Sequence, residues 1–178
     1  MKVTAVSAIE DSRQPRTRGH ATPYKLVVLA PDTTDAVAAA GGLIVDSTRA
    51  GWQVEIFLET GSAERALRIL GVGSHTLPGT FDFGLHWPDA VVFAASTYDA
   101  HRGVRRFISD AARRHRANVA CWGGACPSSP VSAAAVEHRL SSAAQAFKYY
   151  AMKALDVTAP ASSVEAFHGA GVPPTVCL

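Results

Sequence analysis

The sequence has little charge and no long uninterrupted apolar run. Charged residues make up 18% of its 178 residues, and the formal net charge is only +2. So small an excess of positive charge gives no reason to expect a nucleic-acid partner. No segment reaches the roughly 18–20 consecutive apolar residues of a membrane span, and the N-terminus lacks the charged and then apolar pattern of a signal peptide. We therefore expect a cytoplasmic protein that binds neither nucleic acid nor membrane.

Cysteine is also scarce. Three cysteines, an odd number, fit a reducing compartment better than a disulfide framework. Cys121 and Cys126 flank the stretch CWGGAC, whose four-residue spacing matches neither a zinc ribbon nor a redox C-x-x-C motif. We expect Cys121 to be a buried strand residue and Gly123 and Gly124 to form the turn that follows it. A nucleophilic Cys126 near a ligand crevice is left open as the alternative.

Hydrophobic residues, by contrast, make up 48% of the chain, which is enough for one globular domain of this length. Met1–Ile9 could form a strand, and the polar segment Glu10–Thr22 is typical of an arm or linker. We therefore assign residues 1–23 to an N-terminal arm and residues 24–178 to a single domain.

Short apolar runs alternate with segments of helical spacing. The expected strands are Tyr24–Ala30, Trp52–Leu58, Ala90–Ala95 and Asn118–Trp122. The expected helices run from the polar turn 32–35 to Gly51, from Ser62 to Leu70, onward from a capping box at Ser96-x-x-Asp99, and over most of Ser132–Leu155. Residues 72–87 should be a loop with at most one short strand, and the tail from residue 156 should be irregular. This alternation predicts an α/β fold with a single doubly wound, Rossmann-like, mostly parallel sheet and helices on both faces.

Chemically useful side chains follow two of the expected strands. Asp32 and Asp35 come after the first strand, and Asp99 and His101 come after the third. Because open α/β sheets bind ligands at the carboxyl ends of their strands, these groups could converge if the two strands are neighbours. Two carboxylates and one imidazole suit a divalent transition metal. On spacing alone, however, capping of helix N-termini is the better explanation of the three aspartates.

The order of motifs resembles that of the LmbE/PIG-L family of metal-dependent N-deacetylases. KLVVLAP and DTTDA stand where the family has an apolar strand and a His-Pro-Asp-Asp-Glu signature, and VAAAGGLI matches the small-residue helix that follows. WQVEIFLETG matches a strand that ends in a Thr-Asp-Gly-like turn, and ALRILGV matches a helix that ends in Leu-Gly-Val. After the third strand, YDAHR stands where the family has His-x-Asp-His and Arg. The resemblance covers most of residues 25–168.

The resemblance implies an altered metal site. In the family, the signature His, the second signature Asp and the last His of the later motif bind zinc, and the first signature Asp is the general base. Asp32, Asp35 and His101 stand at the three ligand positions, which implies a more anionic site for a divalent metal such as zinc. Thr34 stands at the base position, and loss of a general base typically costs roughly 100- to 10,000-fold in rate. Asp99 is the candidate replacement base.

Whether the protein is an enzyme is therefore left open, and three functions are compatible with the sequence. The first is a divergent hydrolase that deacetylates an N-acyl amino sugar or a glycosylated small molecule, with Tyr98 and Arg102 of the later motif contacting the substrate. The second is a pseudoenzyme that binds a sugar-like ligand, a protein partner or its own copy. The third is a biosynthetic enzyme that uses the same crevice for metal-free chemistry and needs no cofactor.

Overall fold

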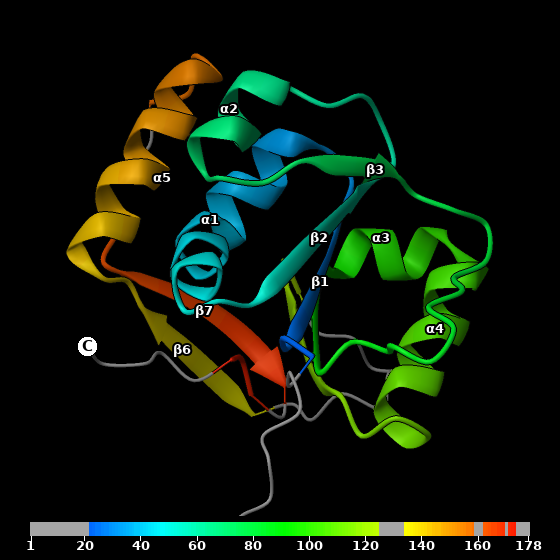
Figure 1. Cartoon of the computed structure of the whole chain (residues 1–178). Helices are drawn as coiled ribbons and strands as arrows, with labels where there is room; N and C mark the ends of the chain where they lie inside the picture. Colours follow the sequence, from blue (N-terminus) through cyan, green and yellow to red (C-terminus); the bar gives the residue numbers. More distant parts are fainter. Residues whose placement is uncertain (1–21, 125–133, 159–161, 170, 174–178) are drawn as a thin grey trace, which may run out of the picture.

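The computed structural model describes residues 22–124, 134–158, 162–169 and 171–173 and has an α/β fold (Figure 1). Almost all of the predicted N-terminal arm, including the strand predicted over Met1–Ile9, lies outside the described residues, as does Cys126. No helix in the described part of the chain combines the length and the apolar character needed to cross a lipid bilayer.

The described residues form a seven-stranded sheet in the order β3-β2-β1-β4-β5-β7-β6. The strands are β1 (Lys25–Ala30), β2 (Gln53–Leu58), β3 (Ser74–Thr76), β4 (Ala90–Ala94), β5 (Asn118–Trp122), β6 (Ala135–Arg139) and β7 (Val164–Gly169). The helices are α1 (Thr33–Arg49), α2 (Glu64–Ile69), α3 (Ala95–Ala100), α4 (Arg102–Arg113) and α5 (Ser142–Ala154). The first five strands in this order pair in parallel, whereas β7 is antiparallel to both β5 and β6. The predicted doubly wound, mostly parallel sheet is confirmed.

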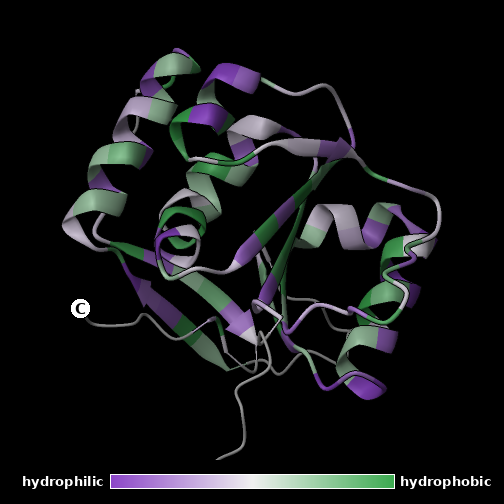
Figure 2. Ribbon diagram, in the orientation of Figure 1, coloured by the Kyte–Doolittle hydropathy of each residue, from purple (hydrophilic) through white to green (hydrophobic). Residues whose placement is uncertain are grey.

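Helices cover both faces of the sheet, as predicted. α1, α2 and α5 share a core with one face, and α3 and α4 share a core with the other (Figure 1). Because successive side chains of a strand point to opposite faces, Leu26 and Val28 of β1 enter the first core while Val27 and Leu29 enter the second. A strand buried on both faces needs apolar residues at successive positions, which explains the uninterrupted run in β1. Figure 2 shows this hydrophobic centre of the molecule.

The turns that end the first elements follow the sequence signals. β1 ends directly before Pro31, and Gly51 and Gly71 follow α1 and α2 with φ angles of 84° and 81°. A left-handed backbone at these positions strains any residue with a side chain, so glycine stops both helices. Gly123 and Gly124, also at positive φ, form the predicted turn after β5.

Two predicted helix starts are wrong. β4 runs directly into α3, so Ser96 lies inside the first turn and provides no side-chain cap. The segment then breaks at His101, which separates α3 from α4, so the single predicted helix is two helices. Ser62 does not cap α2 either, because the N-cap residue is Ala63 and the helix begins at Glu64. The N–H of the N-cap residue Ala63 instead donates to Thr33 Oγ1 at 3.0 Å.

The C-terminal part of the prediction needs the largest correction. The first part of the predicted helix Ser132–Leu155 contains β6, and α5 begins only at Ser142. The tail that was expected to be irregular contains β7, which inserts between β5 and β6. The alanine-rich sequence favours a helix locally, but the cross-strand pairing of all five β6 residues with β7 overrides that preference.

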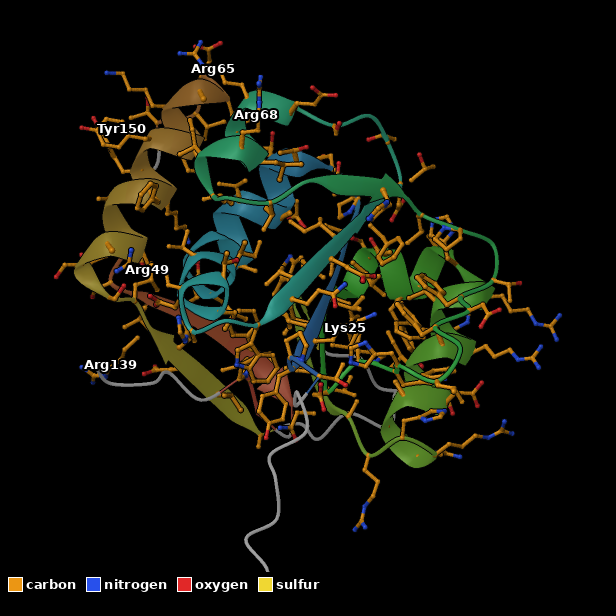
Figure 3. All side chains as sticks on the ribbon, in the orientation of Figure 1. Lys25, Arg49, Arg65, Arg68, Arg139 and Tyr150 are labelled. Carbon is orange, nitrogen blue, oxygen red and sulfur yellow. The ribbon has the colours of Figure 1, made fainter. Side chains whose placement is uncertain are left out.

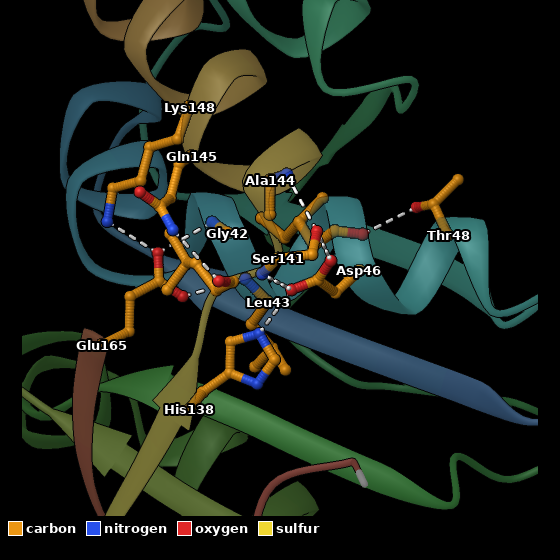
Figure 4. Close-up of polar contacts among 12 residues, drawn as sticks. Gly42, Leu43, Asp46, Thr48, His138, Ser141, Ala144, Gln145, Lys148 and Glu165 are labelled. Carbon is orange, nitrogen blue, oxygen red and sulfur yellow. Dashed lines mark hydrogen bonds and ion pairs between the residues drawn. The ribbon is translucent and has the colours of Figure 1, made fainter. Parts of the chain in front are cut away.

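A buried carboxylate of β7 fastens this C-terminal unit to α1 (Figure 4). Glu165 accepts hydrogen bonds from the backbone N–H groups of Gly42 and Leu43, at 2.7 and 2.9 Å, in the middle of α1. The same carboxylate pairs with Lys148 of α5 at 2.6 Å. A buried charge is tolerated when it is paired and hydrogen-bonded, and Glu165 meets both conditions.

A second carboxylate, Asp46 of α1, fastens β6 and the start of α5 in the same region (Figure 4). Asp46 contacts His138 Nε2 at 3.0 Å and accepts hydrogen bonds from Ser141 N at 3.1 Å and Ser141 Oγ at 2.5 Å. Ser141 Oγ in turn accepts a hydrogen bond from Ala144 N and so caps α5. The network joins α1 to β6 and α5, whose contacting residues lie 92 and 95 positions later in the chain.

Candidate functional site

The carboxyl ends of β1 and β4 lie side by side at the point where the strand order reverses. In open α/β sheets this reversal opens a crevice beyond the strand ends, and ligands bind there. The adjacency of these two strands, on which convergence of the predicted site residues depends, is therefore confirmed. Four segments meet at this edge, namely the turn after β1, the end of β2, α3 and the end of β5.

Asp32 caps α1, which is the role that its spacing alone favoured over metal binding. Its backbone is extended, with φ of −154°, and its Oδ1 accepts a hydrogen bond from Asp35 N at 2.9 Å. This contact satisfies one of the unpaired N–H groups at the helix start and places negative charge at the positive end of the helix dipole.

Asp35 lies in the first turn of α1 and faces the end of β5. Its Oδ2 accepts a hydrogen bond from Trp122 Nε1 at 2.8 Å. Trp122 is 5% exposed, so the indole N–H has little access to water and needs this partner. One carboxylate oxygen of Asp35 is thus used within the protein.

His101 lies beside a carboxylate that follows β2. Its Nε2 is 3.2 Å from Glu59 Oε2, in an orientation that gives an electrostatic contact without a well-formed hydrogen bond. The other carboxylate oxygen of Glu59 accepts a hydrogen bond of 2.5 Å from Thr97 Oγ1, and the Thr97 side chain is fully buried. Glu59 therefore links the end of β2 to α3 and holds the imidazole at the crevice.

The remaining predicted site residues occupy different environments. Thr34, Asp99 and Arg102 are exposed. Tyr98, predicted to contact substrate, is only 4% exposed and packs on Phe93 with ring centroids 5.5 Å apart. Its ring belongs to the second core, beneath α3.

The predicted metal ligands do not form a three-ligand group. In the described part of the chain, no three His, Cys, Asp or Glu side chains are close enough together to hold a metal ion. Asp35 is turned toward Trp122 and His101 toward Glu59, while Asp32 binds the start of its own helix. These side chains, as they are arranged, do not fit the metal of the family site.

A small polar hollow adjoins Glu59. It has a volume of about 120 Å³ and lies where β2 and β3 end. Its lining is Leu58, Glu59, Thr60, Gly61, Ser62, Ser74, His75 and Thr76. Four hydroxyl groups, a carboxylate and an imidazole give this space both donors and acceptors of hydrogen bonds.

Sequence reasoning missed Glu59, Thr97 and Trp122 as members of this edge. Glu59 follows β2 at the family's Thr-Asp-Gly-like turn, and Trp122 is the last residue of β5. Both could have been found by taking the carboxyl end of every strand, and not only of two strands, as part of the crevice. Cys121 is a buried strand residue, as predicted, and its thiol donates to Gly124 O at 3.6 Å.

Three solved structures share this fold. The first is the A40926 pseudoaglycone deacetylase Dbv21, with a TM-score of 0.56 and 14% identity over 83% of this chain and 97% of that chain. The second is a triple mutant of the deacetylase Orf2 of the teicoplanin biosynthetic pathway, with a TM-score of 0.54 and 14% identity over 82% of this chain and 97% of that chain. The third is a deacetylase in complex with teicoplanin, with a TM-score of 0.53 and 12% identity over 82% of this chain and 97% of that chain. Protein-family models and curated proteins give no match. The three are LmbE/PIG-L-family deacetylases, so the resemblance seen in the sequence is confirmed in the fold. Identities this low establish the fold alone.

Proposed function

We propose that the protein binds a sugar-containing small molecule at the carboxyl edge of β1, β2, β4 and β5 and does not perform the metal-assisted hydrolysis of the LmbE/PIG-L deacetylases. The observation that carries this proposal is that, among the described residues, no three His, Cys, Asp or Glu side chains lie close enough together to hold a metal ion, and each side chain at a family ligand position makes another contact. Asp32 caps a helix, Asp35 binds Trp122, and His101 lies against Glu59. The hydroxyl of Thr34 at the position of the general base supports the same conclusion.

The polar hollow beside Glu59 supports a hydroxyl-rich ligand. A volume of about 120 Å³ takes one substituent of a sugar, such as an acetamido group, while the ring lies along the open edge. Hydroxyl groups on Thr60, Ser62 and Ser74 can exchange hydrogen bonds with such a substituent, because each both donates and accepts. The shared fold with deacetylases of glycopeptide biosynthesis supports a small molecule and not a polymer as the ligand.

The test is a titration with glucosamine, N-acetylglucosamine and N-acetylmannosamine, followed by amide chemical shifts. We expect saturable shifts at the ends of β2 and β3 and in α3. Glu59→Gln should weaken the affinity by about fivefold or more, because it removes a charged hydrogen-bond acceptor from the hollow. Glu64→Gln, at the exposed start of α2, is the matched control and should bind as the wild type does.

Release of acetate is assayed in the same samples with and without added zinc. Saturable binding without acetate release supports the proposal. Zinc-dependent release of acetate would overturn it in favour of hydrolysis, and the absence of saturable binding to all three sugars would overturn it altogether.

A divergent zinc-dependent amide hydrolase is the second candidate. The observation in its favour is that His101 Nε2 is buried but makes no hydrogen bond, which is unusual for a polar atom. Metal ligation by Asp32, Asp35 and His101 would use the oxygen of Asp35 that does not bind Trp122 and would require His101 to turn away from Glu59. Elemental analysis separates the candidates: about one zinc per chain, lost in His101→Ala, would favour the hydrolase.

A further inference from the structure

We propose a second ligand site, separate from the proposed function, in the hollow between the sheet and the aromatic segment formed by residues 77–87. This hollow has a volume of about 550 Å³ and shares only His75 with the polar hollow beside Glu59. It is lined by Lys25, Glu55, Phe57, His75, Pro78, Thr80, Phe81, Asp82 and Phe83. Its volume falls within the roughly 300–1,000 Å³ that is usual for small-molecule pockets.

The walls of the hollow are aromatic rings held in place by the core behind them. Phe81 stacks on Phe107 of α4 at 4.3 Å between centroids, and Phe83 lies 5.4 Å from the same ring. Phe57 of β2 meets Phe81 edge to face at 5.4 Å. All three wall residues are partly exposed while they pack against the second core. Rings fixed from behind and open in front form a surface that needs no rearrangement to receive a flat apolar ligand.

The charged groups of the hollow are not equally available. Lys25, labelled in Figure 3, has a side chain that is 8% exposed, and its ammonium lies 3.2 Å from Glu55 Oε1 and 5.1 Å from the centre of the Phe83 ring. This cation is already paired and covered. Glu55 is 20% exposed, and Asp82 is exposed with only its Oδ1 bound, to Gly84 N.

Because Lys25 pairs with Glu55, the excess negative charge among the carboxylates and the ammonium of the hollow is that of the exposed Asp82. Negative charge next to aromatic faces attracts a cation, through the carboxylates and through the ring quadrupoles. The chemistry therefore selects a small planar aromatic molecule that carries a protonated amine. An aromatic acid of the same shape would meet the exposed carboxylate of Asp82 with like charge and should be rejected.

The site is tested by titrating the full chain with tryptamine, and with indole-3-acetate as a probe of matched shape and opposite charge. Binding is followed by saturation-transfer and amide-shift NMR. We expect saturable shifts in β2 and residues 77–87 with tryptamine and none with indole-3-acetate. Asp82→Asn, an exposed change that leaves the fold intact, should weaken tryptamine binding about fivefold. Phe81→Leu should weaken it further, and Glu64→Gln should leave it unchanged.

Three results would overturn the proposal. The first is the absence of saturable tryptamine binding. The second is equal binding of the two probes, since it removes charge from recognition. The third is tryptamine binding that neither Asp82→Asn nor Phe81→Leu reduces, since it removes both the carboxylate and the aromatic wall. These outcomes are independent of sugar binding at the carboxyl edge, because the two hollows are probed with different ligands and variants.

Discussion

The hydrogen bond between Trp122 and Asp35 joins the end of β5 to the first turn of α1 at the candidate site. We expect Trp122→Phe to lower the free energy of unfolding by about 1–3 kcal/mol, because it leaves a partly buried carboxylate without its donor and removes ring volume beside Phe167. Urea denaturation measures the loss. Trp52→Phe is the matched control, since Trp52 is less buried and stacks on Tyr24 at 5.1 Å. Equal losses in the two variants would contradict a stabilising role for the hydrogen bond.

The site residues show how far single positions can be read from the sequence. The role of Asp32 as a helix cap was predictable, because capping depends on neighbours within three residues. The partners of Asp35 and His101 lie 87 and 42 positions away in the chain, on β5 and after β2. Only the order of strands in the sheet brings these pairs together, so no local pattern could show that the predicted ligands are engaged elsewhere.

The Gly41-Gly42 pair gives a sharper test of packing at α1. A Cβ atom at Gly42 would lie 2.3 Å from Leu140 Cγ, whereas a Cβ atom at Gly41 would meet Lys148 Cγ at 3.3 Å. We expect Gly42→Ala to destabilise the protein by about 1–3 kcal/mol through overpacking. Gly41→Ala should cost much less, because the better helix propensity of alanine, worth about 1 kcal/mol, offsets the mild crowding. Thermal unfolding of both variants checks the difference, and the reverse order would refute the tight approach of Leu140.

The first β-α units were predictable element by element because each carries its own signals. Pro31, Gly51 and Gly71 mark the ends of three elements, and the buried strands have uninterrupted apolar runs. The C-terminal unit was not predictable in this way. β6 is a short edge strand with the burial pattern exposed, intermediate, exposed, buried, exposed, so it lacks an apolar run. Its conformation comes from pairing with β7, which is about 30 residues away in the sequence.

The start of α4 supports the aromatic segment 77–87. A Cβ atom at Gly103 would lie 2.3 Å from the backbone oxygen of Gly79, whereas a Cβ atom at Gly79 itself would meet nothing within 4 Å. We expect Gly103→Ala to push this segment away from α4 and to cost about 1–3 kcal/mol of stability, since backbone cannot give way as a side chain does. The fluorescence of Trp87, which stacks on His115 at 3.8 Å, should change with it. Gly79→Ala should be nearly neutral in both measurements, and a loss equal to that of Gly103→Ala would contradict this account.

The β6–α5–β7 unit packs into the first core with α1 and α2 and is also held to α1 by polar contacts. β1 and β4 are buried along their whole length at the centre of the sheet, whereas the β6–α5–β7 unit lies at one end of it (Figure 1). That unit is held to α1 by Asp46 and Glu165 as well as by apolar packing. Proteins open locally where fewer buried contacts hold a unit in place. The C-terminal unit should therefore open before the centre of the sheet.

Hydrogen exchange of Asp46→Ala tests this division. The substitution leaves Ser141 N, Ser141 Oγ and His138 without the carboxylate that joins them to α1. Loss of a charged acceptor from several donors costs about 1–3 kcal/mol. We expect exchange to become about five- to 100-fold faster in β6, α5 and β7, and to stay at the wild-type rate in β1, β2 and β4.

The control for this experiment is Asp110→Ala, which removes an exposed ion pair with Arg114 on α4 and should leave exchange in both parts unchanged. A uniform increase across all strands in Asp46→Ala would mean that the chain opens as one cooperative unit and would contradict the division. No increase in β6 and α5 would mean that apolar packing alone holds the unit against α1. A selective increase, in contrast, would show that Asp46 helps to attach β6 and α5 to α1. The local sequence alone does not specify that attachment.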